Sequence, residues 1–233
     1  MLEKHRYKLE EYYSANYRKI HTNSSISLGD KFMHSKLSGS TKHAKLGSIL
    51  EIGSGNFEHF YFENNFDKYT SVDIRQPNET ALSEYLSVSS AETFFKLTDG
   101  GTLPFTEGEF DTLVATCVAL HVENYDEALT DWIRVVRPGG VIKFVVLCET
   151  SPMLKLIRLL FSYRSARKFG ISRTDYDLIN ALDHVNSYER IKVITKAVLM
   201  PENDLKITFY PFSFIRSQSF NVFAIYKIQK ASK

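Results

Sequence analysis

Two glycines and an acidic residue in the first half of the chain have the spacing of a ligand-binding turn. The apolar run 48–52 predicts a buried strand, and it ends at Gly53-Ser54-Gly55. Glycines at such a point let the chain turn sharply and bring backbone N–H groups close to a ligand. A second apolar strand ends in Asp73, whose carboxylate suits the two hydroxyls of a ribose. This succession predicts a nucleotide-binding half-fold.

Two histidines have neighbours suited to proton transfer. His121 follows a predicted strand, and open α/β sheets place their active crevice at such strand ends. His184 lies between Asp183 and Asn186, so an acid, an imidazole and an amide stand together. Histidine suits acid–base work near neutral pH. We predict His184 or His121 as a general base, with Asp183 and Asn186 binding the substrate. The alternatives are a histidine that packs against the turn and an ordinary surface helix turn.

These residues need a sheet to position them, and apolar segments alternate with helical ones from Gly47 onward. That alternation predicts a parallel sheet covered on both faces. The predicted strands are 48–52, 69–73, 93–97, 111–117, 141–147, 205–214 and 220–228. The predicted helical stretches are 57–66, 79–87, 124–136, 152–168 and a last one ending near 199. We expect one domain, with an N-terminal cap at 1–44, a cofactor-binding core at 45–149 and an acceptor-side region at 150–233.

Composition narrows the class of protein. The 233 residues are 43% hydrophobic and 13% aromatic, which are globular values. A net charge of +2 does not support a nucleic-acid partner. Residues 1–19 lack an apolar signal-peptide core, and no run is long enough to span a membrane. Cys117 and Cys148 are expected to be buried, reduced thiols in a cytoplasmic protein, and no Cys/His spacing suits zinc, so we expect no metal.

Two segments admit alternatives. Residues 1–44 are either a packing arm or a lid over the site, with Tyr17 and His34 facing the substrate, while His59 is expected to be solvated. The helix 152–168 is expected to bury its apolar side on the sheet. Its alternative is contact with an anionic membrane or a phosphorylated acceptor, because cations lie along it.

The stretch from about 48 to 147 resembles the class I S-adenosylmethionine-dependent methyltransferases, in particular their small-molecule branch. Several pieces in the right order and spacing make the resemblance specific. Phe57 stands where that family has a third glycine. The matching pieces are Leu50-Glu51-Ile52-Gly53-Ser54-Gly55, Val72-Asp73, Asp99-Gly100, Leu103-Pro104-Phe105, Phe110-Asp111-Thr112-Leu113-Val114, Leu120-His121-Val122 and Arg137-Pro138-Gly139-Gly140.

The resemblance implies a Rossmann-like α/β fold. Its seven-stranded sheet would be mostly parallel, with an antiparallel last strand and helices on both faces. The cofactor would be S-adenosyl-L-methionine, with the turn near its methionine part. Glu51 would organise that turn through hydrogen bonds, Asp73 would accept from the ribose, and the Cys117 carbonyl would face the ammonium. The residues assigned to the cofactor are Glu51, Gly53, Ser54, Gly55, Asp73, Asp99, Gly100 and Cys117.

The function expected from this resemblance is methyl transfer to a small molecule or a sugar-like glycan precursor, at oxygen. A nicotinamide-dependent oxidoreductase is the enzyme alternative. Glu58 argues against it, because a dinucleotide fingerprint has its third glycine there. A scaffold that binds without turnover is the other alternative, and it would follow if Asn56 and Phe57 crowd the turn.

Overall fold

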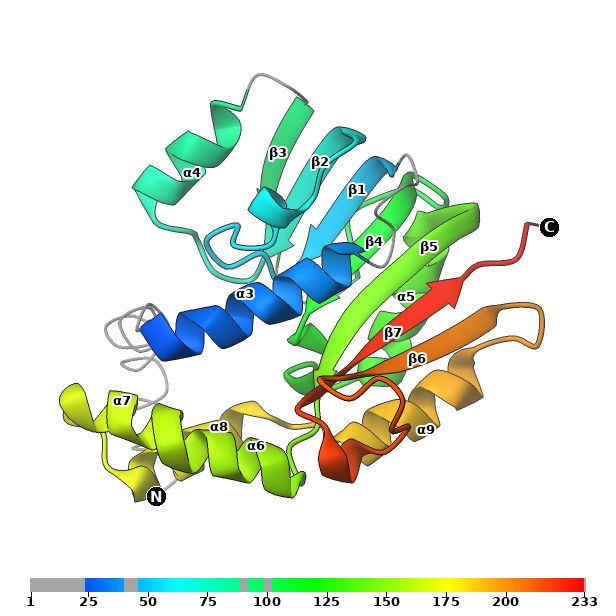
Figure 1. The fold of residues 1–233 in the computed structure, drawn as a ribbon. Helices are drawn as coiled ribbons and strands as arrows, with labels where there is room; N and C mark the ends of the chain where they lie inside the picture. Colours follow the sequence, from blue (N-terminus) through cyan, green and yellow to red (C-terminus); the bar gives the residue numbers. More distant parts are fainter. Residues whose placement is uncertain (1–23, 40–45, 89–91, 99–101, 233) are drawn as a thin grey trace.

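The computed structural model describes residues 24–39, 46–88, 92–98 and 102–232, and within them the chain forms a seven-stranded sheet (Figure 1). The spatial order of the strands is β3-β2-β1-β4-β5-β7-β6. Their bounds are β1 Gly47–Ile52, β2 Phe66–Asp73, β3 Glu92–Leu97, β4 Phe110–Thr116, β5 Val136–Leu147, β6 Asp204–Tyr210 and β7 Phe223–Gln229.

Strand directions confirm the predicted sheet. Strand β1 pairs in parallel with β2 and β4, and β4 pairs in parallel with β5. Strand β7 runs antiparallel to both β5 and β6. The central strand β4 is buried at every position from Thr112 to Ala115, as expected for a strand covered on both faces. Because β1 and β4 are parallel neighbours, their carboxyl ends open at the same edge of the sheet.

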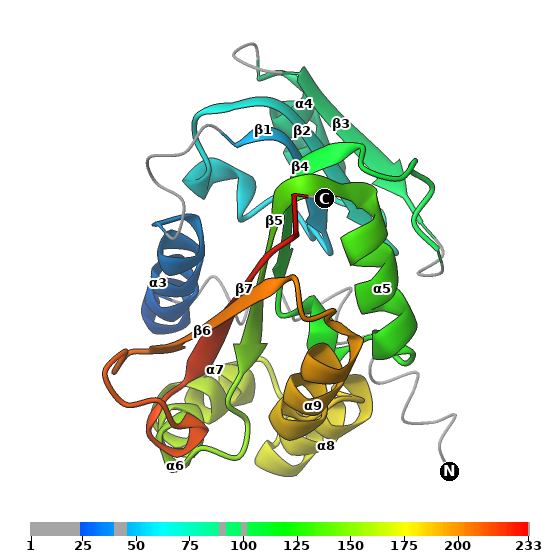
Figure 2. The ribbon, with the colours of Figure 1, turned by 90° about the vertical axis from the view of Figure 1, so that its right-hand side faces the viewer.

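Helices cover both faces of the sheet (Figure 2). Helices α3 Ser24–Gly39 and α4 Glu79–Leu86 pack on one face, where Met33 and Tyr85 enter the core. Helices α5 Tyr125–Val135 and α9 Tyr188–Val198 pack on the other, where Trp132 and Ile191 do the same. The sheet thus has two apolar layers, which explains the near-continuous apolar runs of its central strands.

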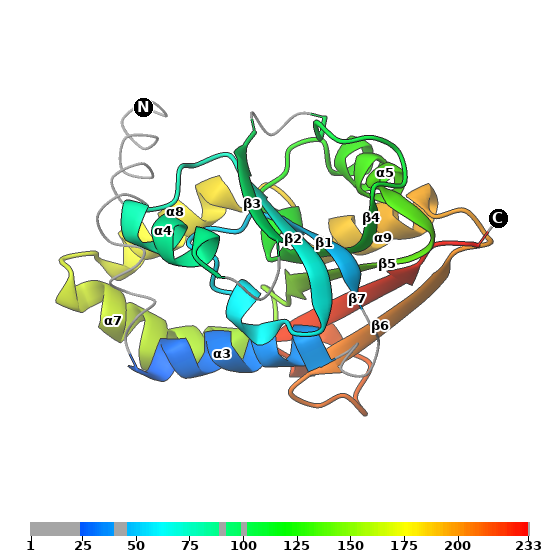
Figure 3. The ribbon, with the colours of Figure 1, turned by 90° about the horizontal axis from the view of Figure 1, so that it is seen from above.

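An insertion between β5 and α9 lies at the edge where the parallel strands end (Figures 1 and 3). It comprises α6 Pro152–Ile157, the π-helical turn η4 Arg158–Ser162, α7 Tyr163–Lys168 and α8 Arg173–Asp183. The prediction that 152–168 buries its apolar side on the sheet fails for part of that side, since Leu154 is buried but Leu160 and Phe161 are exposed, and the run lies along the sheet edge. None of the helices in the described ranges has both the length and the apolar run needed to cross a bilayer.

Local predictions fail in three other places. The stretch 57–66 is mostly a turn, with only the short helix η2 Phe60–Phe62. Strand β5 begins at Val136 rather than 141, because Val136 pairs with Phe110 beside a register shift in β4. Helix α8 occupies part of a segment, 165–183, that carried no clear helical pattern, and it begins at the Ser172 cap.

Candidate active site

The glycine turn after β1 adopts a conformation that suits glycine. Gly53 and Gly55 have φ of 68° and 55°, in the left-handed region. The Gly53 N–H donates to the Val72 carbonyl at 2.9 Å, which ties the turn to β2. A Cβ on Gly53 would lie 2.3 Å from Cγ2 of Val118. The turn is therefore pressed against the short helix η3 Val118–Leu120, which follows β4.

Asp73 closes the other side of the turn. Its Oδ2 accepts from the Gly55 N–H at 2.9 Å, and its Oδ1 accepts from the Arg75 N–H at 2.8 Å. Each carboxylate oxygen keeps a lone pair for a further donor. The Ser54 hydroxyl is buried and has no hydrogen-bond partner among the described residues. The Asp73 carboxylate can therefore accept from a polar ligand, and the Ser54 hydroxyl is a buried group that still lacks a partner in the described part of the chain.

Phe57 takes the place of a glycine without blocking the turn. Its φ of 66° is unusual for an aromatic residue. The side chain is fully buried and stacks on Tyr85 with ring centroids 4.1 Å apart. Glu58 supports the turn, since its Oε2 accepts from the Asn56 N–H at 3.0 Å. The Phe57 ring therefore packs in the core, and the crowding that a non-catalytic scaffold would require at this residue is not seen.

Glu51 has partners other than those we expected. Its carboxyl accepts from the Tyr69 hydroxyl at 3.1 Å and from the Ser71 hydroxyl at 3.4 Å, both on β2. Burial raises the pKa of Glu51 to about 8. The turn amides bond instead to Asp73, Glu58 and the end of β2. Glu51 thus joins β1 to β2, and its expected part in organising the turn stays a prediction.

The structure brings both predicted catalytic histidines together. Nδ1 of His121 lies 3.0 Å from Oδ2 of Asp183, and Nδ1 of His184 pairs with Oε1 of Glu149. The two rings are nearly perpendicular, with centroids 4.8 Å apart. Nη2 of Arg158 lies 3.6 Å from the same Glu149 oxygen. We call His121, Asp183, His184 and Glu149 the histidine cluster.

Asn186 is a buried residue that fixes the backbone around His121. It is 1% exposed, and its N–H donates to the Leu120 carbonyl at 3.0 Å. Its side-chain nitrogen donates to the carbonyls of Ala119 and Val122. These bonds clamp the backbone on both sides of His121. We therefore assign Asn186 a positioning role in place of the direct contact with substrate that we expected.

The arrangement suits proton transfer. A histidine whose Nδ1–H donates to a carboxylate presents Nε2 as an acceptor. Both histidines have such a partner. The ligand atoms of His121, Asp183 and His184 also lie within 4.8 Å of one another, close enough to hold one divalent cation. The expectation of no metal rested only on the spacing of residues along the chain. Such spacing does not reveal ligands that the fold brings together from two distant segments, as it does His121 with Asp183 and His184.

Glu149 was missed by the sequence analysis. Its position two residues after the end of β5 was the available signal. Strand β5 is the neighbour of β4, and β4 precedes His121. Three other predicted site residues, Tyr17, Asp99 and Gly100, lie outside the described residues.

Cys117 has φ of 61° and ends β4 in a left-handed turn. Its Sγ lies 3.7 Å from Sδ of Met33, so the side chain faces α3. Both cysteines are free, as expected. That the Cys117 carbonyl faces the cofactor stays a prediction.

His34 belongs to a separate polar group. Its Nδ1 lies 3.1 Å from Nδ1 of His59, whose Nε2 lies 3.0 Å from Oε1 of Glu63. Nζ of Lys143 donates to the same oxygen at 2.7 Å. We call His34, His59, Glu63 and Lys143 the buried cluster. The prediction that His59 is solvated is wrong, because the residue is 1% exposed. His34 joins α3 to this group, and we assign it a structural role rather than the substrate contact we expected.

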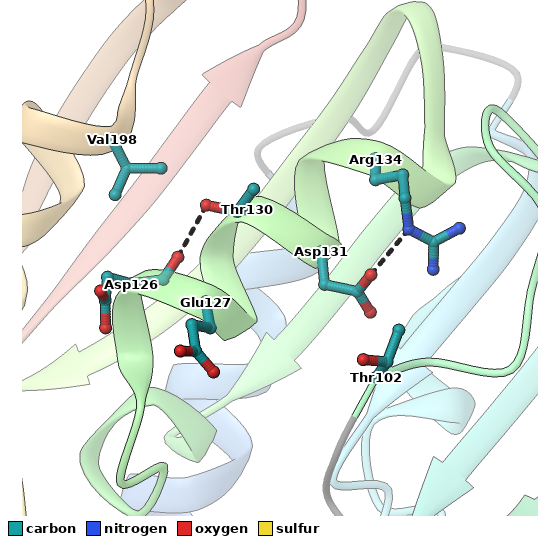
Figure 4. A pocket seen from close by; sticks show the side chains of 7 residues that line it. All are labelled: Thr102, Asp126, Glu127, Thr130, Asp131, Arg134 and Val198. Carbon is teal, nitrogen blue, oxygen red and sulfur yellow. Dashed lines mark hydrogen bonds and ion pairs between the residues drawn. The ribbon is translucent and has the colours of Figure 1, made fainter.

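A hollow of about 340 Å³ beside α5 contains none of the predicted site residues (Figure 4). Three of its polar side chains, Thr130, Asp131 and Arg134, have partners within the protein. Nε of Arg134 donates to Asp131 at 2.7 Å, and the Thr130 hydroxyl donates to the Asp126 carbonyl at 2.8 Å. Arg134 also donates to the carbonyls of Leu103 and Phe105. These contacts hold the loop that enters β4.

Comparison with known proteins agrees with this geometry. Residues 50–144 match the family model described as a methyltransferase domain. The chain is 30% identical over 114 residues to the polyketide synthase-nonribosomal peptide synthetase pyiS of Pyricularia grisea, covering 45% of this chain and 3% of that protein. It is 26% identical over 110 residues to the human thiol S-methyltransferase TMT1A, covering 42% of this chain and 41% of that protein. The matches thus span less than half of the length of these relatives.

Solved structures extend the similarity to the whole fold. The plantazolicin methyltransferase BpumL, solved with a triazolic desmethylPZN analog and SAH, superposes with a TM-score of 0.64 at 16% identity. The alignment covers 99% of this chain and 97% of that one. The sheet order, the glycine turn and Asp73 agree with the fold of S-adenosylmethionine-dependent methyltransferases. Residues 50–144 match a methyltransferase domain, and S-adenosylmethionine is the cofactor that this match implies.

The residues present fit that cofactor. The turn has no Cβ at Gly53 and Gly55, so backbone can approach a ligand closely. Asp73 retains acceptor capacity for ribose hydroxyls, and the buried Ser54 hydroxyl beside it has no hydrogen-bond partner among the described residues.

Proposed function

We propose that this chain transfers a methyl group from S-adenosylmethionine to an oxygen of a small-molecule or glycan-precursor acceptor. The observation that carries the proposal is the contact between the two halves of the site. Val118 of η3 packs directly on Gly53 of the cofactor turn, and His121 follows η3. The histidine cluster therefore begins immediately beyond the element that touches the cofactor turn.

The bound cofactor supplies a methyl group on a positively charged sulfur, which a nucleophile attacks in line. The chain contributes alignment and a proton acceptor. His184, held by Glu149, accepts the proton of the acceptor hydroxyl at Nε2 as the oxygen forms its bond to carbon. His121, held by Asp183, lies beside it and lines the acceptor space. A hydroxyl is a weak nucleophile until its proton is removed, so an oxygen acceptor requires a base at this position.

The cofactor half is tested by Asp73→Ala. Loss of this carboxylate removes charge-assisted acceptors, so we expect S-adenosylhomocysteine affinity to fall about 10- to 100-fold. Isothermal titration calorimetry measures it, with Asp204→Ala as control, because Asp204 is an exposed carboxylate at the far edge of the sheet. Unchanged affinity would remove Asp73 from the site. Stabilisation of the chain by NAD, and none by S-adenosylhomocysteine, would favour the oxidoreductase instead.

The acceptor half is tested by turnover. The chain is incubated with S-adenosylmethionine and a panel of hydroxyl, amine and thiol acceptors, and S-adenosylhomocysteine release is measured. We expect hydroxylated acceptors to be methylated. Parallel reactions with EDTA test the cation that the histidine cluster could hold, and full activity there would leave the cluster as a base. Binding of the cofactor with no turnover on any acceptor would support the scaffold alternative.

A further inference from the structure

The helical run from α6 through η4 to α7 turns large apolar side chains toward solvent. Leu156, Leu159, Leu160 and Phe161 are between 41% and 54% exposed. We call these four residues the apolar ridge. Single exposed leucines are common on protein surfaces, but a group of them within two turns of one helix forms a patch that requires explanation. Phe220 of η5 Gln218–Phe220, an element that packs against α6, is also exposed, at 59%.

The same run is strongly basic. Between residues 152 and 168 there are five cations and no acid, although the whole chain has a net charge of only +2. The five are Lys155, Arg158, Arg164, Arg167 and Lys168. Arg158 lies near Glu149, whereas Arg164 and Arg167 form no ion pair with any residue that the structure describes. Positive charge is therefore concentrated beside the apolar ridge.

Three arginines line a hollow at one end of the ridge. The hollow has a volume of about 410 Å³, and Arg164, Arg167 and Arg173 line it together with Leu159, Tyr163 and Ser172. Arg173 lies over the Tyr163 ring at 4.7 Å and reaches Asp177 only at 3.9 Å. The acids nearest to the hollow, Asp175 and Asp177, bond to Ser172 and Tyr163. Guanidinium groups that line one hollow can bind a phosphate.

Leu159 belongs to both the ridge and the hollow, so the two features form one surface. A free phosphate would occupy the arginines and leave the exposed ridge unexplained. An anionic bilayer would use both, since phosphate headgroups and the acyl boundary lie a few ångströms apart. We propose that the run 152–168 docks on an anionic lipid bilayer, with the apolar ridge entering the interface and the arginine hollow holding a lipid phosphate.

Docking at this surface would place the active site at the lipid interface. The run starts just beyond β5, and Arg158 reaches Glu149 of the histidine cluster at 3.6 Å. If the proposed function holds, the acceptor is therefore membrane-associated or lipid-linked. The docking itself does not depend on methyl transfer, so it is tested by binding alone.

The test is co-sedimentation of the full chain with vesicles of phosphatidylcholine, with and without phosphatidylglycerol. We expect binding only to the anionic vesicles, and weaker binding as salt rises. Arg164→Glu with Arg167→Glu should lower binding by at least about tenfold. The matched charge control is Lys196→Glu with Lys206→Glu, which changes the net charge equally at exposed sites elsewhere.

The ridge is tested by Leu160→Gln with Phe161→Gln, which should also weaken binding about tenfold or more. Its control is Val193→Gln with Met200→Gln, two exposed apolar residues outside the ridge. Thermal denaturation checks that each variant is folded. Binding to neither vesicle, or equal losses in variants and controls, would overturn the proposal. Stabilisation by glycerol phosphate without vesicle binding would assign the hollow to a free phosphate and overturn it as well.

Discussion

Two pairs of histidines in this domain share their residue types and differ in access to solvent. In the buried cluster the side chains of His59 and Lys143 have no exposed surface, that of Glu63 is 2% exposed, and His34 is 9% exposed. In the histidine cluster the exposed fraction of the side chain is 34% for His121, 20% for Glu149, 13% for Asp183 and 10% for His184. The contrast is largest between His59, which no ligand can reach, and His121, which is open to solvent. The two clusters thus differ in access to solvent more than in residue type.

Burial sets the protonation of the buried cluster. It lowers the pKa of His34 to about 4, and it lowers the pKa of His59 as well. Burial alone would raise the pKa of Glu63, but the hydrogen bond from His59 and the charge of Lys143 hold it at about 2. The buried cluster therefore contains one sealed ion pair, between Lys143 and Glu63, and two neutral histidines. His34 donates a hydrogen bond to His59, and His59 donates one to Glu63.

The largest effect is expected from His184→Gln. Removing the proton acceptor should lower kcat about 10²- to 10⁴-fold, because that is the usual contribution of a general base. Steady-state kinetics measures it, and S-adenosylhomocysteine affinity should stay unchanged. His59→Gln is the contrasting variant, and it should lower stability while the folded fraction keeps its kcat. If both variants lost activity in the same proportion as they lost folded protein, the distinction between the clusters would fail.

Glu63→Gln should cause the largest loss of stability. The change leaves the Lys143 ammonium buried without its counter-charge, which costs about 3–5 kcal/mol. Urea denaturation measures the free energy of unfolding. Glu189→Gln is the matched control, because Glu189 pairs with Lys192 at an exposed site and should contribute less than about 1 kcal/mol. A loss at Glu63 no larger than at Glu189 would contradict the sealed ion pair.

His34 should make the domain sensitive to mild acid. Its pKa is depressed in the folded state, so its contribution to stability is present above pH 6.5 and is lost as the pH falls toward 4. The loss should approach about 1.4 kcal/mol per pH unit. His34→Gln should flatten this dependence in melts recorded between pH 4 and 7. An unchanged slope would show that His34 is solvated or charged in the folded protein.

Glu149→Gln should have the smallest effect of the set. The variant keeps the shape of the side chain but removes the charge that orients His184, so we expect kcat to fall about tenfold with little change in KM. The pH profile of kcat separates this from simple loss of packing, because its acidic limb should move. Rescue by Glu149→Asp would support orientation by charge. An unaltered profile would contradict it.

The strands were predictable because their signals are local. Apolar runs bounded by glycine or polar turns located each of the seven within a few residues, except where a shift in β4 extends β5 back to Val136. The glycine turn and Asp73 were equally local, since their chemistry depends on two neighbouring strands. The pairing of His121 with Asp183 was harder, yet both positions stood out by their neighbours in the chain.

The buried cluster could not be predicted, because its charges meet across 80 residues of sequence. Lys143, alone inside the apolar run of β5, was the one local sign that a buried acid must lie nearby. The outward ridge was missed for a related reason. A helical pattern shows which side chains share a face but not whether a sheet lies beneath that face.

The π-helical turn at 158–162 has a geometric consequence. A π turn accommodates one residue more than a regular α-helical turn. Deleting a single residue there would restore a continuous α-helix. Every side chain after the deletion would then rotate by about 100° around the helix axis relative to the residues before it. Arg164 and Arg167 would then point away from Leu159. The extra residue of the π turn therefore sets the angle around the helix axis between the apolar side chains and the arginines.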